Sequence, residues 1–194
     1  MSLTPSTMLP LGTPLPLGLM EAALEPVLGG PLRGEALGRR PVLVLFICPH
    51  CPFVKHIEPE LGRMERDFAD QLALLAICSN SPQTHPHDGP AGMEAQAERQ
   101  GWRFAYLADP SQEVAKAFRA ACTPDLFLFD ADHRLVYRGQ LDGSRPGNAV
   151  PLDGRDLRAA IVSLLAGHPL PAAQAASIGC NIKWHPGQEP AWAR

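Results

Sequence analysis

The stretch of sequence that decides the fold is Val42-Leu43-Val44-Leu45-Phe46-Ile47-Cys48-Pro49-His50-Cys51. Its first six residues form a short continuous apolar run, which is typical of a buried strand. The apolar residues that follow recur at the spacing of one helix face: Phe53, Val54, Ile57, Leu61, Met64 and Phe68. A strand, a Cys-x-x-Cys pair and a helix predict a thiol–disulfide redox site.

The position of the two cysteines suits this chemistry. Only a thiolate attacks a disulfide, and the free amide groups at a helix N-terminus stabilise that anion. Two cysteines at this spacing can also close a disulfide across one helical turn, so the pair can alternate between dithiol and disulfide. Cys48 and Cys51 are therefore the predicted catalytic residues.

A Cys-x-x-Cys pair also occurs as one half of a structural zinc site, which needs a second pair of Cys or His ligands. The remaining cysteines, Cys78, Cys122 and Cys180, stand far apart in the sequence. His85 and His87 lie close together in a Pro-rich loop, but no cysteine pair accompanies them. The sequence therefore favours redox chemistry and predicts no metal site.

Length and charge exclude several classes of protein. A chain of 194 residues fits one domain with a hydrophobic core. The net charge is −3 without a block of like charge, so we expect neither a nucleic-acid nor a membrane partner. No Lys or Arg precedes Arg33, so the charged region of a signal peptide is absent and we expect a cytoplasmic location. Five cysteines then indicate one redox pair plus others.

The chain divides into three parts. Residues 1–40 are rich in Pro, Gly and Leu and predict an N-terminal extension that packs on the domain, with an irregular hairpin over 19–28. Residues 41–166 form the predicted redox domain. Residues 167–194 form a tail that should fold back on the domain, because Ile178, Ile182 and Trp184 are costly to leave exposed together.

Within the domain, helices alternate with strands. We predict strands over 41–47, 72–78, 103–107, 126–129 and 135–137. Helices are predicted over 52–69 and 91–100, and two more follow the capping residues Asp109 and Asp153. Strands separated by helices pair in parallel, and the closing hairpin adds an antiparallel edge. The expected fold class is α/β, a mixed central sheet with helices on both faces.

Three motifs carry a resemblance to a known family: residues 46–52, Cys122-Thr123-Pro124 before a Phe-rich strand, and residues 136–139. On these motifs the chain resembles the thioredoxin-like redoxins. It resembles in particular their peroxiredoxin-like branch, the alkyl hydroperoxide reductase/thiol-specific antioxidant group, over roughly residues 10–166. The resemblance implies a thioredoxin-like fold. Residues 177–184 in the tail are also similar to uncharacterised peroxiredoxin-like proteins.

The resemblance also implies roles for single residues. Cys48 corresponds to the exposed nucleophile, and Cys51 to the cysteine that resolves the mixed disulfide. Pro124 corresponds to a proline in a cis peptide bond that faces the pair, and the backbone of Thr123 to the strand edge that binds the substrate chain. The resemblance implies no cofactor other than the redox-active disulfide itself.

Three residues concern the reactivity of the thiols. Pro49-His50 is similar to the dipeptide of periplasmic thiol oxidases, and His50 is expected to lower the pKa of Cys48 by a hydrogen bond or a positive charge. Cys180 has two interpretations. It is either buried as packing, or it reaches the pair as a third, resolving thiol.

Three functions remain open. The first is a thiol–disulfide oxidoreductase that acts on a disulfide-bearing protein or a small thiol, with an unidentified electron donor. The second is a peroxiredoxin-like thiol peroxidase, although Cys48 and Leu45 stand where the two registers of the motif P-x-x-x-T-x-x-C require threonine. The third is a thiolate metal-binding module. The strand 42–47 also lacks the buried acid that thioredoxin keeps there.

Overall fold

The computed structural model describes residues 3–193, and its secondary structure follows the predicted alternation. The strands are β1 (Leu3–Pro5), β2 (Glu25–Leu28), β3 (Val42–Phe46), β4 (Ala73–Cys78), β5 (Ala105–Ala108), β6 (Cys122–Thr123), β7 (Asp125–Phe129), β8 (Leu135–Arg138) and β9 (Ile178–Asn181). The helices are α1 (Leu17–Ala23), α2 (Gly34–Leu37), α3 (Pro52–Phe68), η1 (Pro86–Asp88), α4 (Pro90–Gln100), α5 (Glu113–Phe118), α6 (Arg155–Leu165) and η2 (Ala191–Ala193).

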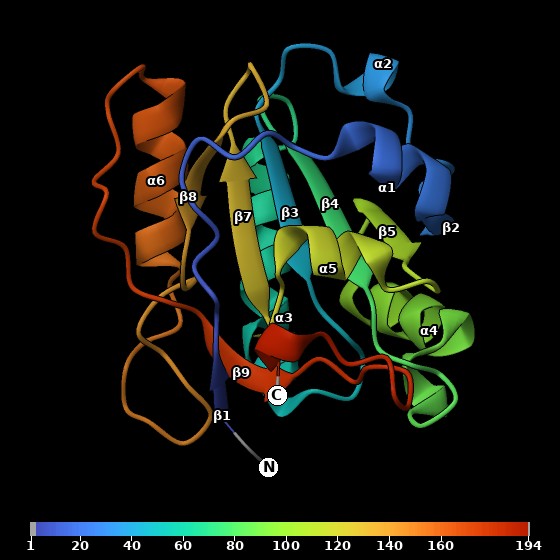
Figure 1. Ribbon diagram of the computed structural model, residues 1–194. Coiled ribbons are helices and arrows are strands. Elements are labelled where there is room, and N and C mark those ends of the chain that lie inside the picture. Colours follow the sequence, from blue (N-terminus) through green and yellow to red (C-terminus); the bar gives the residue numbers. More distant parts are fainter. Residues whose placement is uncertain (1–2, 194) are drawn as a thin grey trace.

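The central sheet has six strands in the order β2-β5-β4-β3-β7-β8 (Figure 1). Strands β3, β4 and β5 are parallel, whereas β2, β7 and β8 join the sheet antiparallel. The predicted mixed sheet with helices on both faces is confirmed, and the fold is thioredoxin-like. Parallel strands leave their carboxyl ends at one edge, so the segments after β3 and β4 lie close together.

Strand β3 is buried on both faces, which explains its unbroken apolar run. Val42, Val44 and Phe46 belong to the core on one face of the sheet, and Leu43 and Leu45 belong to the core on the other. Helices α3, α4 and α6 cover the second of these faces, and α1, α5 and part of the tail cover the first (Figure 1).

Three local predictions need correction. The segment 19–28 is not a hairpin, because Leu17–Ala23 is helical and β2 pairs with β5 at the sheet edge. Asp109 does not begin a helix. Its carboxylate instead accepts hydrogen bonds from the Ala115 amide (2.9 Å) and the Ser79 hydroxyl (2.8 Å), and α5 begins four residues later at Glu113. The last helix begins at Arg155, after Gly154.

A second, smaller sheet crosses the lower end of the molecule in Figure 1 and has the strand order β1-β9-β6. Both of its pairings are antiparallel, and β9 lies between β1 near the N-terminus and β6 of the cis-proline loop. Ile182 and Trp184, which follow β9, are buried in the core on the α5 side of the central sheet. Sequence periodicity did not predict β9.

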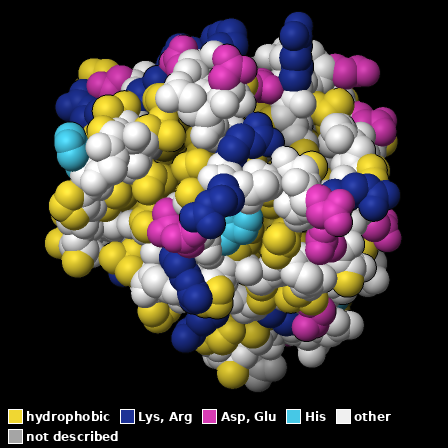
Figure 2. All heavy atoms as spheres, turned by 90° about the horizontal axis from the view of Figure 1, so that it is seen from above, with side chains coloured by type: hydrophobic (Ala, Val, Ile, Leu, Met, Phe, Trp, Pro, Cys, Tyr) yellow, Lys and Arg dark blue, Asp and Glu magenta, His cyan; other side chains and the backbone are white. Residues whose placement is uncertain are grey.

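Two surface properties bear on partners. No helix within residues 3–193 is long and apolar enough to cross a membrane. Figure 2 shows the face at the top of Figure 1, where Lys and Arg side chains lie among Asp and Glu side chains. One contact on the exposed surface is an ion pair between Arg39 and Asp132 at 2.7 Å. The face in Figure 2 therefore carries no block of one charge.

Candidate active site

Cys48 and Cys51 lie where β3 ends and α3 begins. The Ile47 amide still donates to the Ile77 carbonyl (3.0 Å), which holds the chain beside β4 just before Cys48. Cys51 is the N-cap residue of α3, and Pro52 fills the first helical position. The pair is in its dithiol state. Both cysteines are 0% exposed, so the expected exposure of Cys48 is wrong for this conformation.

The two thiols differ in ionisation. The pKa of Cys51 is lowered to about 5, first by a hydrogen bond with Cys48 and then, against the opposing effect of burial, by hydrogen bonds with Thr123, the Val54 amide and Cys180. Burial raises the pKa of Cys48, and its hydrogen bond to Cys51 raises it further. The two shifts share one cause, a Cys48–Cys51 hydrogen bond that lets the reduced pair hold a single proton at the N-terminus of α3.

The expected role of His50 stays a prediction. Its Nδ1 atom lies 3.7 Å from Cys48 Sγ, within hydrogen-bond reach of the thiol. The His50 imidazole is also bonded to the Asp88 carboxylate, which accepts a further hydrogen bond from the His50 amide (3.1 Å). Pro49, the other predicted pKa-tuning residue, is half-buried next to Cys48.

Asp88 is a site residue that sequence reasoning missed. It lies in η1 on the segment after β4, and its side chain is buried. Besides the two contacts with His50, it accepts a hydrogen bond from Asn80 Nδ2 (2.8 Å). An acid is thus present beside the pair, although β3 itself carries none. In the sequence, only its position could have indicated this role. Asp88 lies in the loop after β4, which is parallel to β3, and the residues of that loop were expected to be solvated.

The predicted cis-proline loop faces the cysteine pair. The Thr123-Pro124 peptide bond is cis, which confirms that expectation. Thr123 Oγ1 lies 3.5 Å from Cys48 Sγ, and the Thr123 carbonyl oxygen lies 3.2 Å from Cys51 Sγ. Residues 75 positions apart in the chain thus form one site.

The strand edge of Thr123 is occupied by the chain's own tail. Strand β9 pairs with β6 so that Cys180 lies opposite Thr123. Cys180 is buried and shares a side-chain hydrogen bond with Cys51. Cys180 is therefore buried and also lies next to the pair, whereas its role as a resolving thiol stays a prediction.

The remaining cysteines do not reach the pair in this way. Cys122 Sγ donates to the Pro124 carbonyl oxygen (3.5 Å), and Cys78 Sγ donates to the Asp88 carbonyl oxygen (3.4 Å). Burial raises the pKa of both thiols above the ordinary value. Both therefore stay protonated at neutral pH.

One group of side chains at the site could hold a metal ion. Cys48, His50 and Asp88 each offer a ligand atom, and these atoms lie within 4.8 Å of one another. It is the only such group within residues 3–193. His185 does not join it, since its ring bonds to Ser81 Oγ (2.8 Å) and the Pro110 carbonyl oxygen (2.9 Å).

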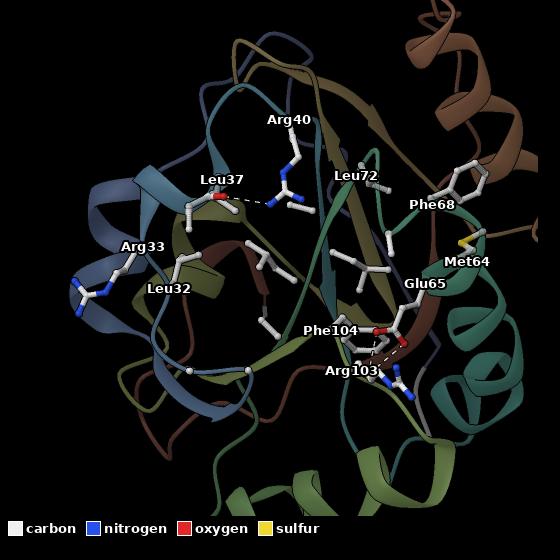
Figure 3. A pocket seen from close by; sticks show the side chains of 18 of the residues that line it. Leu32, Arg33, Leu37, Arg40, Met64, Glu65, Phe68, Leu72, Arg103 and Phe104 are labelled. Atoms are coloured by element: carbon white, nitrogen blue, oxygen red, sulfur yellow. Dashed lines mark hydrogen bonds between the residues drawn. The ribbon is translucent and has the colours of Figure 1, made fainter.

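The open space in the molecule is not at the cysteine pair. Near the pair, the cavity beside Pro124 and Ile178 has a volume of only about 20 Å³, enough for about one water molecule. A pocket of about 730 Å³ lies at the opposite end of the sheet, between α2, the C-terminal part of α3 and the first residues of β4 (Figure 3). Leu72, Phe68 and Phe104 line it, Arg40 points toward Leu37 there, and no cysteine contributes to it.

Comparisons with solved structures find two similar chains of unassigned function. An uncharacterised conserved protein from Geobacillus kaustophilus is 46% identical, with a TM-score of 0.89 over 96% of this chain and 98% of that one. A hypothetical protein from Sinorhizobium meliloti 1021 is 42% identical, with a TM-score of 0.86 over 95% of this chain and 100% of that one. Both share nearly the whole architecture, tail included.

A third structure extends the likeness of fold. The secreted disulfide oxidoreductase of Mycobacterium tuberculosis that is homologous to Escherichia coli DsbE is 15% identical, with a TM-score of 0.59 over 76% of this chain and 98% of that one. No curated protein matches the chain. The AhpC/TSA family model matches residues 21–138, from α1 to the end of β8. With its thioredoxin-like sheet and its dithiol at the start of α3, the chain belongs to the AhpC/TSA family of redoxins.

Proposed function

We propose that this protein is a thiol–disulfide oxidoreductase whose redox group is the Cys48–Cys51 pair. The observation that carries the proposal is the position of the two thiols. They lie at the N-terminus of α3 and face the cis-proline loop, with Cys48 Sγ 3.5 Å from Thr123 Oγ1 and Cys51 Sγ 3.2 Å from the Thr123 carbonyl oxygen. A hydrogen bond between the two thiols lowers the pKa of Cys51 and raises that of Cys48, so the reduced pair can hold a single proton. The pair therefore holds one negative charge at neutral pH, and exchange can begin when the remaining proton moves from Cys48 to Cys51.

The exchange with a disulfide R–S–S–R runs in two steps. As the resemblance implies, Cys48 attacks one sulfur while its proton passes along the existing hydrogen bond to the Cys51 thiolate. A mixed disulfide forms and the first RS⁻ leaves. Cys51 then attacks Cys48 Sγ, the second thiol leaves with the proton from Cys51, and the protein is oxidised to the Cys48–Cys51 disulfide.

Asp88 and His50 act as positioning residues in this scheme. The buried carboxylate holds both the backbone and the ring of His50, and so fixes that ring 3.7 Å from Cys48 Sγ. The His85 ring stacks on the outer side of His50, with the centroids 5.0 Å apart. The wall next to Cys48 is therefore polar and fixed in place.

The proposed partners follow from the chemistry. The oxidant is a disulfide-bearing protein or a small disulfide that binds beside Thr123 and Pro124. An electron donor then returns the pair to the dithiol. The reaction needs no cofactor beyond the two sulfurs, and we propose that it takes place in the cytoplasm, without nucleic-acid or membrane partners.

Insulin reduction tests the proposal. With dithiothreitol as donor, the wild type should accelerate precipitation of the insulin B chain. The Cys48→Ser and Cys51→Ser variants should both fall to the rate without protein. Cys78→Ser is the matched control, because it removes a buried thiol that the scheme does not use. Equal activity in all four proteins would reject the redox role of the pair.

Trapping separates the two cysteines' roles. In Cys51→Ser the attack by Cys48 survives while resolution does not, so mixed disulfides with insulin or glutathione should accumulate on Cys48. Accumulation on Cys51 in the Cys48→Ser variant, with none in Cys51→Ser, would reverse the assignment.

Peroxidase activity is a second candidate function. Cys51-Pro52 opens α3 with a low-pKa thiol, and the family includes thiol-specific antioxidant proteins. In that reaction the Cys51 thiolate would take one oxygen from a hydroperoxide and release an alcohol. Cys48 would then close the disulfide and release water. Hydrogen peroxide consumption measured beside insulin reduction distinguishes the two functions.

A metal-binding module is the third candidate, favoured by the ligand group of Cys48, His50 and Asp88. Elemental analysis of the purified protein after incubation with Zn²⁺ or Cu(I) and dialysis tests it. Retention of one equivalent that disappears in Asp88→Asn would support this function, and an apo protein would reject it.

A further inference from the structure

Strand β9 fits closely against the cis-proline loop. An ideal Cβ built at Gly179 would lie 2.0 Å from the Thr123 carbonyl oxygen and 2.7 Å from its carbonyl carbon. Such contacts are far inside van der Waals distance, so only glycine allows β9 to approach the loop this closely. The closest packing of the tail is thus at the residue next to Cys180.

The tail after β9 is anchored on both sides of the site. The Ile182 amide donates to the Ala121 carbonyl (3.1 Å), ahead of the cis-proline loop. The Lys183 amide donates to Asn80 Oδ1 (2.8 Å), and the Lys183 carbonyl accepts from the Ser81 amide (2.7 Å). Asn80 also bonds to Asp88, so the tail and the wall beside His50 share one network.

These contacts fix the direction of Cys180. Successive side chains of a strand point to opposite faces. Asn181 is exposed, and Gly179 is buried against the Thr123 carbonyl but has no side chain. Cys180 therefore points inward, where it is 3% exposed and hydrogen-bonds with Cys51. Cys51 thus has two thiol neighbours, Cys48 and Cys180.

We propose that Cys180 is a third redox thiol, which exchanges into the oxidised pair and forms a Cys51–Cys180 disulfide. This inference rests on the proposed function, because that function supplies the Cys48–Cys51 disulfide. The Cys180 thiolate attacks Cys51 Sγ, the Cys48–Cys51 bond breaks, and Cys48 leaves as a thiolate that takes up the proton lost by Cys180. No electron enters or leaves in this step.

The charge on Cys51 determines in which redox state Cys180 can react. In the dithiol state the pKa of Cys180 is raised to about 12, chiefly by burial and next by its contacts with Cys51. Oxidation removes the negative charge from Cys51, so the part of the shift that Cys51 causes disappears when exchange becomes chemically available. Cys180 is therefore inert beside the reduced pair and becomes more acidic beside the oxidised pair.

The exchange also changes access to the site. A Cys51–Cys180 bond ties β9 covalently to α3, so the edge of Thr123 stays paired with the tail. Cys48 then carries the only thiol of the three. We therefore infer that this form is closed to protein disulfides.

Disulfide mapping tests the inference on the whole chain. The protein is oxidised with excess oxidised glutathione, quenched in acid and alkylated with N-ethylmaleimide, and its peptides are identified by mass spectrometry. The wild type should yield both the Cys48–Cys51 and the Cys51–Cys180 disulfide. Cys48→Ser should yield Cys51–Cys180, and Cys180→Ser should yield Cys48–Cys51.

The outcomes separate this inference from the proposed function. A Cys51–Cys180 disulfide that is absent from both the wild type and Cys48→Ser would overturn the inference alone. Pairing of Cys51 with Cys122 or Cys78 in Cys48→Ser, at the same yield as with Cys180, would also overturn it. A missing Cys48–Cys51 disulfide in Cys180→Ser would instead overturn the proposed function. The wild-type measurement does not depend on any variant's folding.

Discussion

The two ends of the parallel strands in this molecule are built in opposite ways. At the amino ends of β3 and β4 lies a pocket of about 730 Å³ that is lined by apolar and charged side chains and by no cysteine (Figure 3). At their carboxyl ends, Cys48 and Cys51 are 0% exposed, and the cavity beside Pro124 has only about 20 Å³. The proposed chemistry therefore lies at the closed end, beneath β9, and not at the open pocket.

The difference shows what closes the site. The thiols are covered by the chain's own tail, which is paired to Thr123 and anchored at Asn80. Reaction with a protein disulfide then requires β9 to leave the edge of Thr123, whereas the opposite end can change without effect on the thiols. The predictions below test this contrast.

The largest expected effect is on the titration of the thiols. The ultraviolet absorbance of thiolate should rise with pH around a midpoint near 5 in the reduced protein. Because the Cys48 hydrogen bond is the main cause of this low pKa, Cys48→Ala should move the midpoint toward that of an ordinary cysteine, about 8.5. Cys51→Ser should abolish the step. A step that persists in Cys51→Ser would place the thiolate elsewhere.

The second effect concerns Asp125, which is buried next to Pro124 at the closed end. Burial raises its pKa to about 7. Between about pH 4 and pH 7 the unfolded chain has lost this proton while the folded protein keeps it. The free energy of unfolding should therefore fall as pH rises through this window, by an amount on the order of 4 kcal/mol, and level off above it.

Urea unfolding at a series of pH values tests this prediction against Asp125→Asn, which has no carboxyl group to titrate. The difference in unfolding free energy between the wild type and the variant should change across the window. Parallel pH profiles for the two proteins would contradict the assigned ionisation of Asp125.

The third effect concerns β9, the strand that covers the thiols. Gly179→Ala places a methyl group against the Thr123 carbonyl, so it should displace β9 and cost about 1–3 kcal/mol of stability. It should also speed the alkylation of Cys51 by iodoacetamide. Gly18→Ala is the control, since nothing lies within 4 Å of its Cβ position. Equal alkylation rates in the two variants would show that β9 does not limit access.

The smallest effect is expected at the open end. Arg40 is exposed beside the pocket, and its Nη2 donates to the Ala36 carbonyl (3.2 Å). Arg40→Ala should change stability by no more than about 0.5 kcal/mol and leave the alkylation rate of Cys51 unchanged. A faster alkylation in this variant would show that the two ends are coupled.

Much of the fold could be predicted from local pattern. The strand at 42–46 is a continuous apolar run because both faces are buried, and Pro52 marks the start of α3. The Cys-x-x-Cys pair and Thr123-Pro124 are short motifs with fixed order along the chain, so their meeting across the fold could be expected.

Other parts of the site depend on contacts between distant residues. Strand β9 has four residues, including a Gly and an Asn, so its sequence shows no apolar alternation, and its partners lie far back in the chain. Asp88 comes from a loop that looks solvated in the sequence. The pKa of Cys51 is lowered by hydrogen bonds with Cys48, Thr123 and Cys180, and contacts with Thr123 and Cys180 cannot be read from the neighbouring sequence.

The redox state of the pair at defined potential tests the central claim most directly. The Cys180→Ser variant is equilibrated in mixtures of reduced and oxidised dithiothreitol, quenched in acid, alkylated and weighed. The protein is unfolded during alkylation, so that every reduced cysteine reacts. We predict a reversible two-electron transition. As the potential becomes more oxidising, Cys48 and Cys51 together stop being alkylated, while Cys78 and Cys122 are alkylated at every potential. Alkylation of both Cys48 and Cys51 at every potential would contradict the claim that they form the redox pair.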